Sequence, residues 1–354
     1  MQFKVERFWP CRSPAAMGAG LLAWCVATWP GVAEAHVKWF CDFNVASQPQ
    51  TLQNVLTSQF AALSVLAVCI LLIGCLVDQT PFGAALSAAL DRVTAPIRAN
   101  ADVLVRAACG FFLIALWTWG GILLTPELKT DSPLIPLLQL GMAASLISPR
   151  TAPFAGFGIV ALYGLALRQY GLFHLMDYPI FLGVAAYLVL TCRPQWNVLE
   201  IRPLEVLRWS ASITLMWASI EKWAYPQWTL PLYLGHPAMS LGYNFDLFMR
   251  AAGVIEFTLA FALLWTPLVR RSAATILIGM FVSATFEFGK IDVVGHSVII
   301  AVLLVLAADN VTRSASIRAW RSLIAPTLGY GLALAAFLAT YYGVHAILFG
   351  TTLT

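Results

Sequence analysis

Long runs of apolar residues dominate the chain, and short polar stretches separate them. A transmembrane α-helix needs about 20 mostly apolar residues to cross the hydrocarbon core of a bilayer. Ten runs approach or exceed this length: 55–77, 103–124, 133–149, 152–170, 172–192, 204–221, 251–268, 272–288, 292–309 and 323–348. The pattern therefore predicts an all-α polytopic membrane protein with about ten transmembrane helices.

The first 35 residues (1–35) have a different pattern. Basic residues at positions 4, 7 and 12 precede an uncharged run over 13–33, and the sequence Ala33-Glu34-Ala35 follows. This order is typical of a secretory signal peptide, whose removal after Ala35 would leave His36 as the new N-terminus. Without cleavage, the same run predicts an anchor helix ahead of an outer segment at 36–54.

Composition narrows the class of protein. Of the 354 residues, 60% are hydrophobic and 11% are charged, and the mean hydropathy is +0.79. Soluble domains have about 25% charged residues, so an ordinary soluble enzyme, a disordered chain and a nucleic-acid-binding protein are excluded. The lipid bilayer is the expected environment. The seven cysteines form no Cys-x-x-Cys pair, which argues against a zinc ribbon or a thioredoxin-like dithiol.

Basic residues near the helix ends predict the orientation, because inner loops of membrane proteins are rich in lysine and arginine. If the N-terminus lies inside and His36 outside, twelve basic residues fall on the inner side and six on the outer side. The inner group is Arg92, Arg98, Arg106, Arg150, Arg193, Arg202, Arg208, Arg270, Arg271, Arg313, Arg318 and Arg321. The outer group is Lys38, Lys129, Arg168, Lys222, Arg250 and Lys290. We therefore expect a multi-pass protein of a bacterial-type cell inner membrane, with the His36 segment on the periplasmic side.

Two halves of the chain share sparse landmarks. Segments 103–192 and 204–309 each predict a unit of four helices that begins on the inner side. The matched pairs are Arg106 with Arg208 at the first helix, Pro126 with Pro226 after it, and Asp177 with Asp292 at the fourth helix. These landmarks favour a tandem parallel repeat. A first membrane helix with an inner loop over 55–102 precedes the two units, and a last helix over 323–348 follows them.

Short motifs mark the second of these units. They are Arg208 before a helix, Glu221-Lys222-Trp223-Ala224-Tyr225-Pro226 after it, Ala252-Gly253-Val254-Ile255-Glu256, Arg270-Arg271, and Phe288-Gly289-Lys290-Ile291-Asp292 ahead of Gly295-His296. With these motifs, residues 205–309 resemble the DoxX family of four-helix membrane proteins. The resemblance implies a membrane component of a quinone-linked sulfur or thiol redox system, with a membrane or periplasmic redox partner. The chain departs from the simple family pattern in its length, its extra helices and its His36 segment.

The same unit holds the main candidate site. Ionisable residues inside membrane helices are costly and mark functional sites, and Glu256 lies about five residues into its helix, roughly 8 Å from its outer end. Aligning Gly141 with Gly253 places Ala144 opposite Glu256, so the first unit lacks this charge. The alternative for Glu256 is a solvated rim in which it only pairs with a lysine.

Three further ionisable residues accompany Glu256 at the predicted outer helix ends. They are Lys222, Asp292 and His296, of which the last two are four residues apart and share one helix face. Since a four-helix bundle brings such ends around one pocket, we expect a single outward-facing catalytic site. In it, Glu256 and His296 handle protons or a metal, and Lys222 balances the charge.

Imidazole and carboxylate groups also suit transition metals such as copper, zinc or iron. The candidate ligands are His36, His174, Asp177 and His296. A processed His36 would offer copper a free amine and an imidazole. However, the sequence has no His-x-x-x-His or Glu-x-x-His pair, and a quinone headgroup or a proton relay is the alternative occupant.

Three classes of function follow. The first is a DoxX-like integral membrane component of a redox or metal-handling system with an outward-facing His/carboxylate site. The second is a proton-coupled transporter of a small molecule or metal ion, and the third is a non-catalytic membrane subunit that docks a partner. No Walker, haem-attachment or nucleophile-elbow motif is present, so whether the chain is an enzyme stays open at this point.

Overall fold

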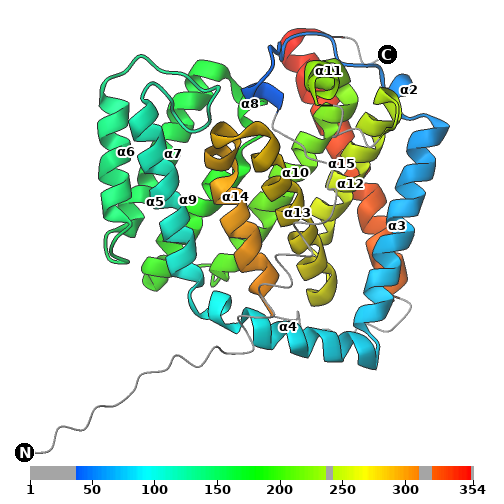
Figure 1. Cartoon of the computed structure of the whole chain (residues 1–354), viewed down its shortest axis with the longest axis horizontal. Helices are drawn as coiled ribbons and strands as arrows, with labels where there is room; N and C mark the ends of the chain where they lie inside the picture. The colour runs from blue at the N-terminus through cyan, green and yellow to red at the C-terminus, as the bar shows by residue number, and fades with distance from the viewer. Residues whose placement is uncertain (1–36, 237–241, 311–320, 352–354) are drawn as a thin grey trace, which may run out of the picture.

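The computed structural model describes residues 37–236, 242–310 and 321–351 (Figure 1). His36 and the predicted signal or anchor segment 1–35 lie outside the described residues. In the described part the secondary structure is helical, apart from one isolated bridge between Ile122 and Lys129. The prediction of an all-α protein is confirmed for these residues.

Each of the ten predicted apolar runs contains a long or medium helix. These are α3 (Ser58–Asp78), α5 (Ala101–Trp119), α6 (Leu134–Ser145), α7 (Ala152–Tyr170), α9 (Pro179–Cys192), α10 (Pro203–Ala224), α12 (Phe245–Ala262), α13 (Pro267–Phe288), α14 (Lys290–Ala308) and α15 (Arg321–Phe349). Among the described residues, five helices are long and apolar enough to cross a membrane, namely α3, α5, α13, α14 and α15. The chain is therefore a helical membrane protein, and a full set of ten spans stays a prediction.

Shorter elements connect these helices. They are η1 (Val37–Trp39), α2 (Leu52–Val55), α8 (Leu172–Leu175), η2 (Pro194–Trp196) and α11 (Pro226–Gly235). Residues 120–131, whose first part was predicted to continue a membrane span to 124, instead fold back as a loop. Gly120 and Gly121 both have positive φ and end the helix there, since glycine adopts this backbone conformation without a steric penalty.

One helix departs from the expectation. The stretch predicted as an inner loop within 55–102 contains α4 (Pro81–Ala99), a 19-residue helix that crosses the lower end of the bundle at a steep angle (Figure 1). Its start is set by Thr80, whose side chain accepts a hydrogen bond from Gly83 N, and by Pro81 in the first turn. Polar residues interrupt the apolar positions of α4, so a search for continuous apolar runs does not find it.

Neighbouring helices along the chain pack on one another, and the two predicted units are used here only to name them. In the first unit, α5 packs on α6, α6 on α7, and α7 on α9; in the second, α10 packs on α12, α12 on α13, and α13 on α14. The units meet through α9 against α10 and α14 against α5. In both contacts the fourth helix of one unit meets the first helix of the other, as expected for a tandem parallel repeat. Helices α3 and α15 pack beside the second unit, with α3 against α12 and α15 against α10.

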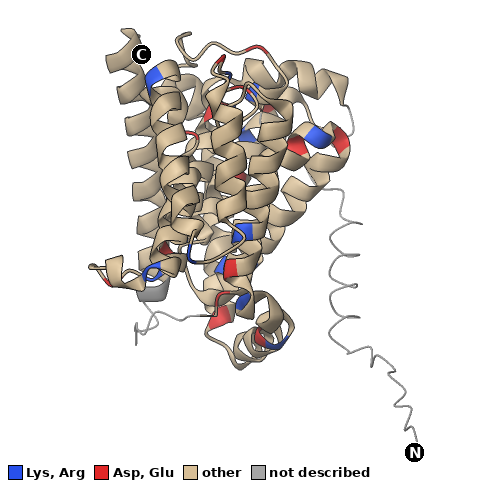
Figure 2. Ribbon diagram, turned by 90° about the vertical axis from the view of Figure 1, so that its left-hand side faces the viewer, with Lys and Arg blue, Asp and Glu red and all other residues tan. Residues whose placement is uncertain are grey.

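The end of the bundle near α4 is rich in arginine, and Figure 2 shows the basic and acidic residues close together there. Arg270 Nη2 donates to Asp309 O at 2.7 Å, and Arg98 Nη1 donates to Ala308 O at 3.2 Å. Arg271 pairs with Asp91 of α4. These guanidinium groups satisfy carbonyls at the C-terminus of α14, where the helix dipole favours positive charge. Arg98, Arg270 and Arg271 of the predicted inner side thus lie at one end of the bundle.

Candidate functional site

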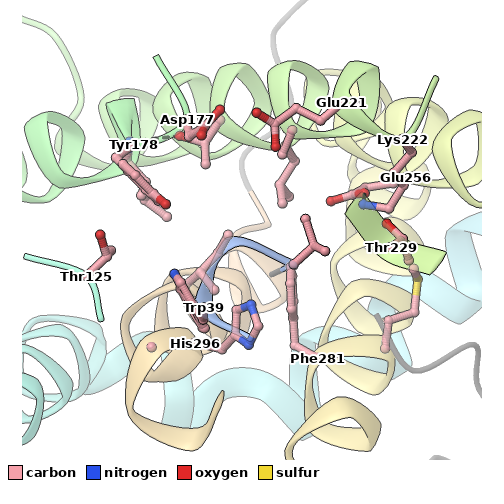
Figure 3. Close-up of a pocket in the computed structure, with 18 of the residues that line it drawn as sticks. Trp39, Thr125, Asp177, Tyr178, Glu221, Lys222, Thr229, Glu256, Phe281 and His296 are labelled. Carbon is pink, nitrogen blue, oxygen red and sulfur yellow. Dashed lines mark hydrogen bonds and ion pairs between the residues drawn. The ribbon is translucent and has the colours of Figure 1, made fainter. Parts of the chain in front are cut away.

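A cavity of about 100 Å³ lies in the second unit, in the half remote from α4, and Figure 3 shows side chains that line it. Its walls come from α10, α12, α13 and α14, and the start of α9 contributes from the first unit. Residues of η1 and α11 line its outer side. Since one water molecule needs roughly 10–15 Å³ of such space, the cavity has room for several waters or for a small polar group.

Three of the four residues predicted to form the catalytic site line this cavity: Glu256, Lys222 and His296. Lys222 Nζ lies 2.5 Å from Glu256 Oε2, and the two side chains are 18% and 7% exposed. Glu256 does not face lipid. The pairing with a lysine, expected as the alternative for Glu256, is therefore present, and it occurs inside a cavity and not at a solvated rim.

A glycine allows α12 to approach α10 closely beside this pair. A Cβ atom on Gly253 would lie 2.3 Å from Trp223 Nε1 and 3.0 Å from Ser219 O. Only hydrogen fits in this space, so Gly253 sets the distance between the two helices. Glu256, one helical turn further along α12, consequently reaches Lys222 in the last turns of α10.

The fourth predicted residue, Asp292, lies beside the cavity. His296 Nδ1 is 3.0 Å from Asp292 Oδ2, one turn away on α14, but the two groups are not aligned for a hydrogen bond. Both Asp292 oxygens are buried and make no hydrogen bond within the described residues. The imidazole of His296 lies between Trp39 and Phe281, with ring centroids 4.7 Å from each. Such unsatisfied buried groups are rare in proteins, and a proton or a water molecule would satisfy them.

Sequence reasoning missed Lys38 and Glu221 as residues of the site. The Lys38 side chain is buried and forms ion pairs with Asp177 and Glu221, and these two carboxylates line the cavity. Burial alone would lower the pKa of Lys38, but the charges and hydrogen bonds of the two carboxylates outweigh it, so that the pKa is raised. The available sequence signal is a lysine within the aromatic stretch Val37–Phe43.

The predicted metal ligands His174 and Asp177 contact different partners. His174 Nε2 lies 3.5 Å from Glu127 Oε1, which also accepts hydrogen bonds from Thr125 and Tyr178. Asp177 instead pairs with Lys38. Within residues 37–236, 242–310 and 321–351, no group of three or more His, Cys, Asp or Glu side chains could hold a metal ion. The geometry of the described chain therefore does not favour the predicted metal site.

A second, more open pocket of about 230 Å³ lies next to the cavity. Its lining includes Asn54, Asp246 and Arg250, and it shares Lys222 and Met249 with the cavity. These two side chains therefore lie between an inner and an outer space. An ion pair at such a boundary could control the passage of protons or of a small solute.

No family model, curated protein or solved structure matches the chain. The resemblance to the DoxX family thus stays a prediction from the motifs of the second unit. The candidate site depends on its own geometry, in which a lysine–glutamate pair and His296 line one cavity and Asp292 lies next to His296.

Proposed function

We propose that the protein is a DoxX-like integral membrane component of a redox system, with an outward-facing site that exchanges protons with a bound quinone headgroup. One observation carries this proposal: Glu256, Lys222 and His296 line a single cavity. Reduction of a quinone to a quinol takes up two electrons and two protons. The electrons would come from a membrane or periplasmic thiol or sulfur partner, as the family resemblance implies.

The side chains suit this chemistry. A histidine changes its protonation near neutral pH and can pass protons between solvent and a bound molecule. His296 presents its ring to the cavity between two aromatic side chains, where a planar headgroup would find apolar faces. Lys222 can stabilise negative charge that develops on a carbonyl oxygen, and Glu256 can supply or accept the accompanying proton.

The position of the cavity favours a site that opens to one side. Its lining residues occupy the half of the second unit remote from α4. The half near α4 is filled by buried side chains such as Leu207, Ala211 and Leu306, and Arg270 and Asp309 close its end. A one-sided site suits a redox subunit that meets its partner on that side.

A proton-coupled transporter is the second candidate, and the outer pocket supports it. Lys222 and Met249 separate that pocket from the cavity, as expected for an occluded state of a permease. Uptake measurements in proteoliposomes under a pH gradient would distinguish the two. Transport of a solute without bound quinone would favour this second candidate.

Binding of a short-chain benzoquinone tests the redox proposal. We expect the purified protein to bind it, and Glu256→Gln to weaken binding about tenfold or more, because one hydrogen-bonded charge is removed from the cavity. The matched control is Glu287→Gln, which alters a more exposed carboxylate that pairs with His236 outside the cavity. Equal binding by both variants, with both folded, would contradict the proposal.

The orientation is also part of the proposal. We infer that the cavity end faces the periplasm and the α4 end the cytoplasm of a bacterial-type inner membrane, because the arginine-rich end is expected inside. Reporter fusions after Gly235 and after Asn197 should lie on opposite sides. The reporter after Gly235 should be periplasmic and the one after Asn197 cytoplasmic, and the reverse assignment or a shared side would overturn this orientation.

A further inference from the structure

A groove of about 870 Å³ runs between α9 and α10. It shares no lining residue with the cavity, so it lies on a different side of these two helices. Leu182, Val206 and Ile213 contribute apolar walls, and residues 199–202 of the loop ahead of α10 line one end. Leu182 and Trp209, which also line the groove, are 38% and 45% exposed. Because exposed apolar side chains of a helical membrane protein face the hydrocarbon, the groove opens toward the bilayer.

The two ends of the groove differ in charge. Arg202 and Glu205 line the end near the arginine-rich end of the bundle, where Arg202 Nη2 lies 4.0 Å from Asp309 Oδ2. The remainder is lined mainly by apolar side chains. From Arg202 to Ile213 the chain rises about 16 Å at the helical rise of about 1.5 Å per residue, which is roughly half of the ~30 Å hydrocarbon core. The groove therefore matches the length of one leaflet, with its charged end at the membrane surface.

The loop at the charged end has a fixed shape. Asn197 Nδ2 donates to Ile201 O at 2.7 Å, and Ile201 N donates to Asn197 Oδ1 at 2.9 Å. Glu200 has a φ of 51°, the only positive φ at a non-glycine position among the described residues. Such a conformation costs about 1–3 kcal/mol and is concentrated at binding and catalytic sites. The side chains of Trp196 and Leu199 are 50% and 78% exposed, as is typical of a segment at the membrane interface.

The charges at this end complement a zwitterion. Glu200 lines the groove, is exposed, and makes no ion pair with another described residue. Arg202 pairs with Glu205, but its side chain is 39% exposed. A guanidinium group has five N–H donors, so Arg202 can also donate to a phosphate. A positive and a negative group at the mouth of an apolar groove match a headgroup that carries both charges.

We propose that this groove binds one ethanolamine phospholipid from the leaflet at the α4 end. Its phosphate lies at Arg202, its ammonium group at Glu200, and one acyl chain along α9 and α10. A primary ammonium group is expected because its three N–H donors can bind the carboxylate, whereas the quaternary ammonium of a choline lipid has none. A glycerol headgroup would leave Glu200 without a cation. The inference does not depend on the proposed redox function, since the groove and the cavity have separate walls.

The headgroup is tested by native mass spectrometry of the full-length protein, delipidated in detergent and titrated with dioleoyl phospholipids. We expect wild type to bind one phosphatidylethanolamine about fivefold or more tightly than phosphatidylcholine or phosphatidylglycerol, the effect of one charged hydrogen bond. Glu200→Gln should reduce the preference over phosphatidylcholine to less than about twofold. Glu287→Gln, which alters an exposed carboxylate outside the groove, is the matched control and should keep the preference.

The position of the acyl chain is tested by filling the groove. Leu182→Trp should weaken phosphatidylethanolamine binding about tenfold, because the larger side chain occupies the chain's place. Leu137→Trp, on the exposed face of α6, is the control and should bind as wild type does. If Leu182→Trp does not accumulate as folded protein, the pair Glu200→Gln and Glu287→Gln decides the matter. Equal affinity of the wild type for the three lipids, or equal binding by the members of either pair, would overturn the proposal.

Discussion

The second helices of the two units, α6 and α12, have the same place in the repeat but different surroundings. Helix α6 has 12 residues, packs on α5 and α7, and exposes Leu134, Leu137 and Leu140 to 69%, 64% and 37%. Helix α12 has 18 residues and is covered by α10 and α13 as well as by α3. A buried carboxylate needs cover on every side, and only α12 has it.

The comparison also shows that aligned positions of the two halves differ in burial. Pairing Gly141 with Gly253 placed Ala144 opposite Glu256, but Gly141 and Ala144 are exposed on α6, whereas Gly253 and Glu256 are buried on α12. The aligned positions therefore face different surroundings. A charge at Ala144 would face lipid, so its absence from the first unit reflects exposure as much as function.

The largest expected effect comes from breaking the ion pair of the second unit. Lys222→Met leaves Glu256 buried without its cation, and we expect a loss of about 2–3 kcal/mol, below the ~3–5 kcal/mol found for fully buried pairs. The first unit supplies the control: Lys129 is exposed, and Lys129→Met should change stability by less than about 0.5 kcal/mol. Denaturation in detergent measures both, and equal losses would show that the two units do not differ in this respect.

Substitution of the two aligned glycines by alanine should change stability by a smaller amount, and in opposite directions at the two positions. In Gly253→Ala the new methyl group would overlap the Trp223 ring, so we expect a loss of about 1–3 kcal/mol from overpacking. In Gly141→Ala the nearest atom lies 4.0 Å from the new Cβ, and the better helix propensity of alanine should add up to about 1 kcal/mol. Unfolding curves of both variants test this, and destabilisation by Gly141→Ala would contradict the assignment of its face to lipid.

Much of the fold could be predicted, because the apolar runs alone locate the ten main helices. The amphipathic helix α4 was missed, since its polar residues Asp91, Arg92 and Arg98 interrupt the run. The sequence also did not predict which helix faces are buried in the two units, because the exposure of α6 depends on which helices pack beside it. Periodicity within one helix does not contain that information.

The candidate site was predicted in part. Glu256 and His296 were singled out because ionisable residues within apolar runs are costly and therefore visible in the sequence, and Lys222 because it directly follows such a run. The role of Lys38 was not found, because it lies in the N-terminal segment and its partners Asp177 and Glu221 are 139 and 183 residues away. Long-range pairing of this kind leaves no local pattern in a single sequence.

The fourth helices of the two units give the last and smallest predicted effect. In α9, a Cβ on Gly183 would lie 1.8 Å from Ser210 Oγ of α10, whereas in α14 a Cβ on Gly295 would lie 2.1 Å from Trp39 Cζ3. Gly183→Ala should therefore disturb the contact between the units, and Gly295→Ala should displace the N-terminal segment over the cavity.

This difference can be measured through Cys41, which is half-buried two residues beyond Trp39. We expect Gly295→Ala to speed modification of Cys41 by a hydrophilic maleimide several-fold while lowering stability by no more than about 1 kcal/mol, because a short segment outside the membrane helices can move aside. Gly183→Ala should lower stability more and leave the labelling rate unchanged. Equal labelling rates of Cys41 in the two variants would contradict this prediction. They would show that Gly295 does not hold the N-terminal segment over the cavity in a way that Gly183 does not.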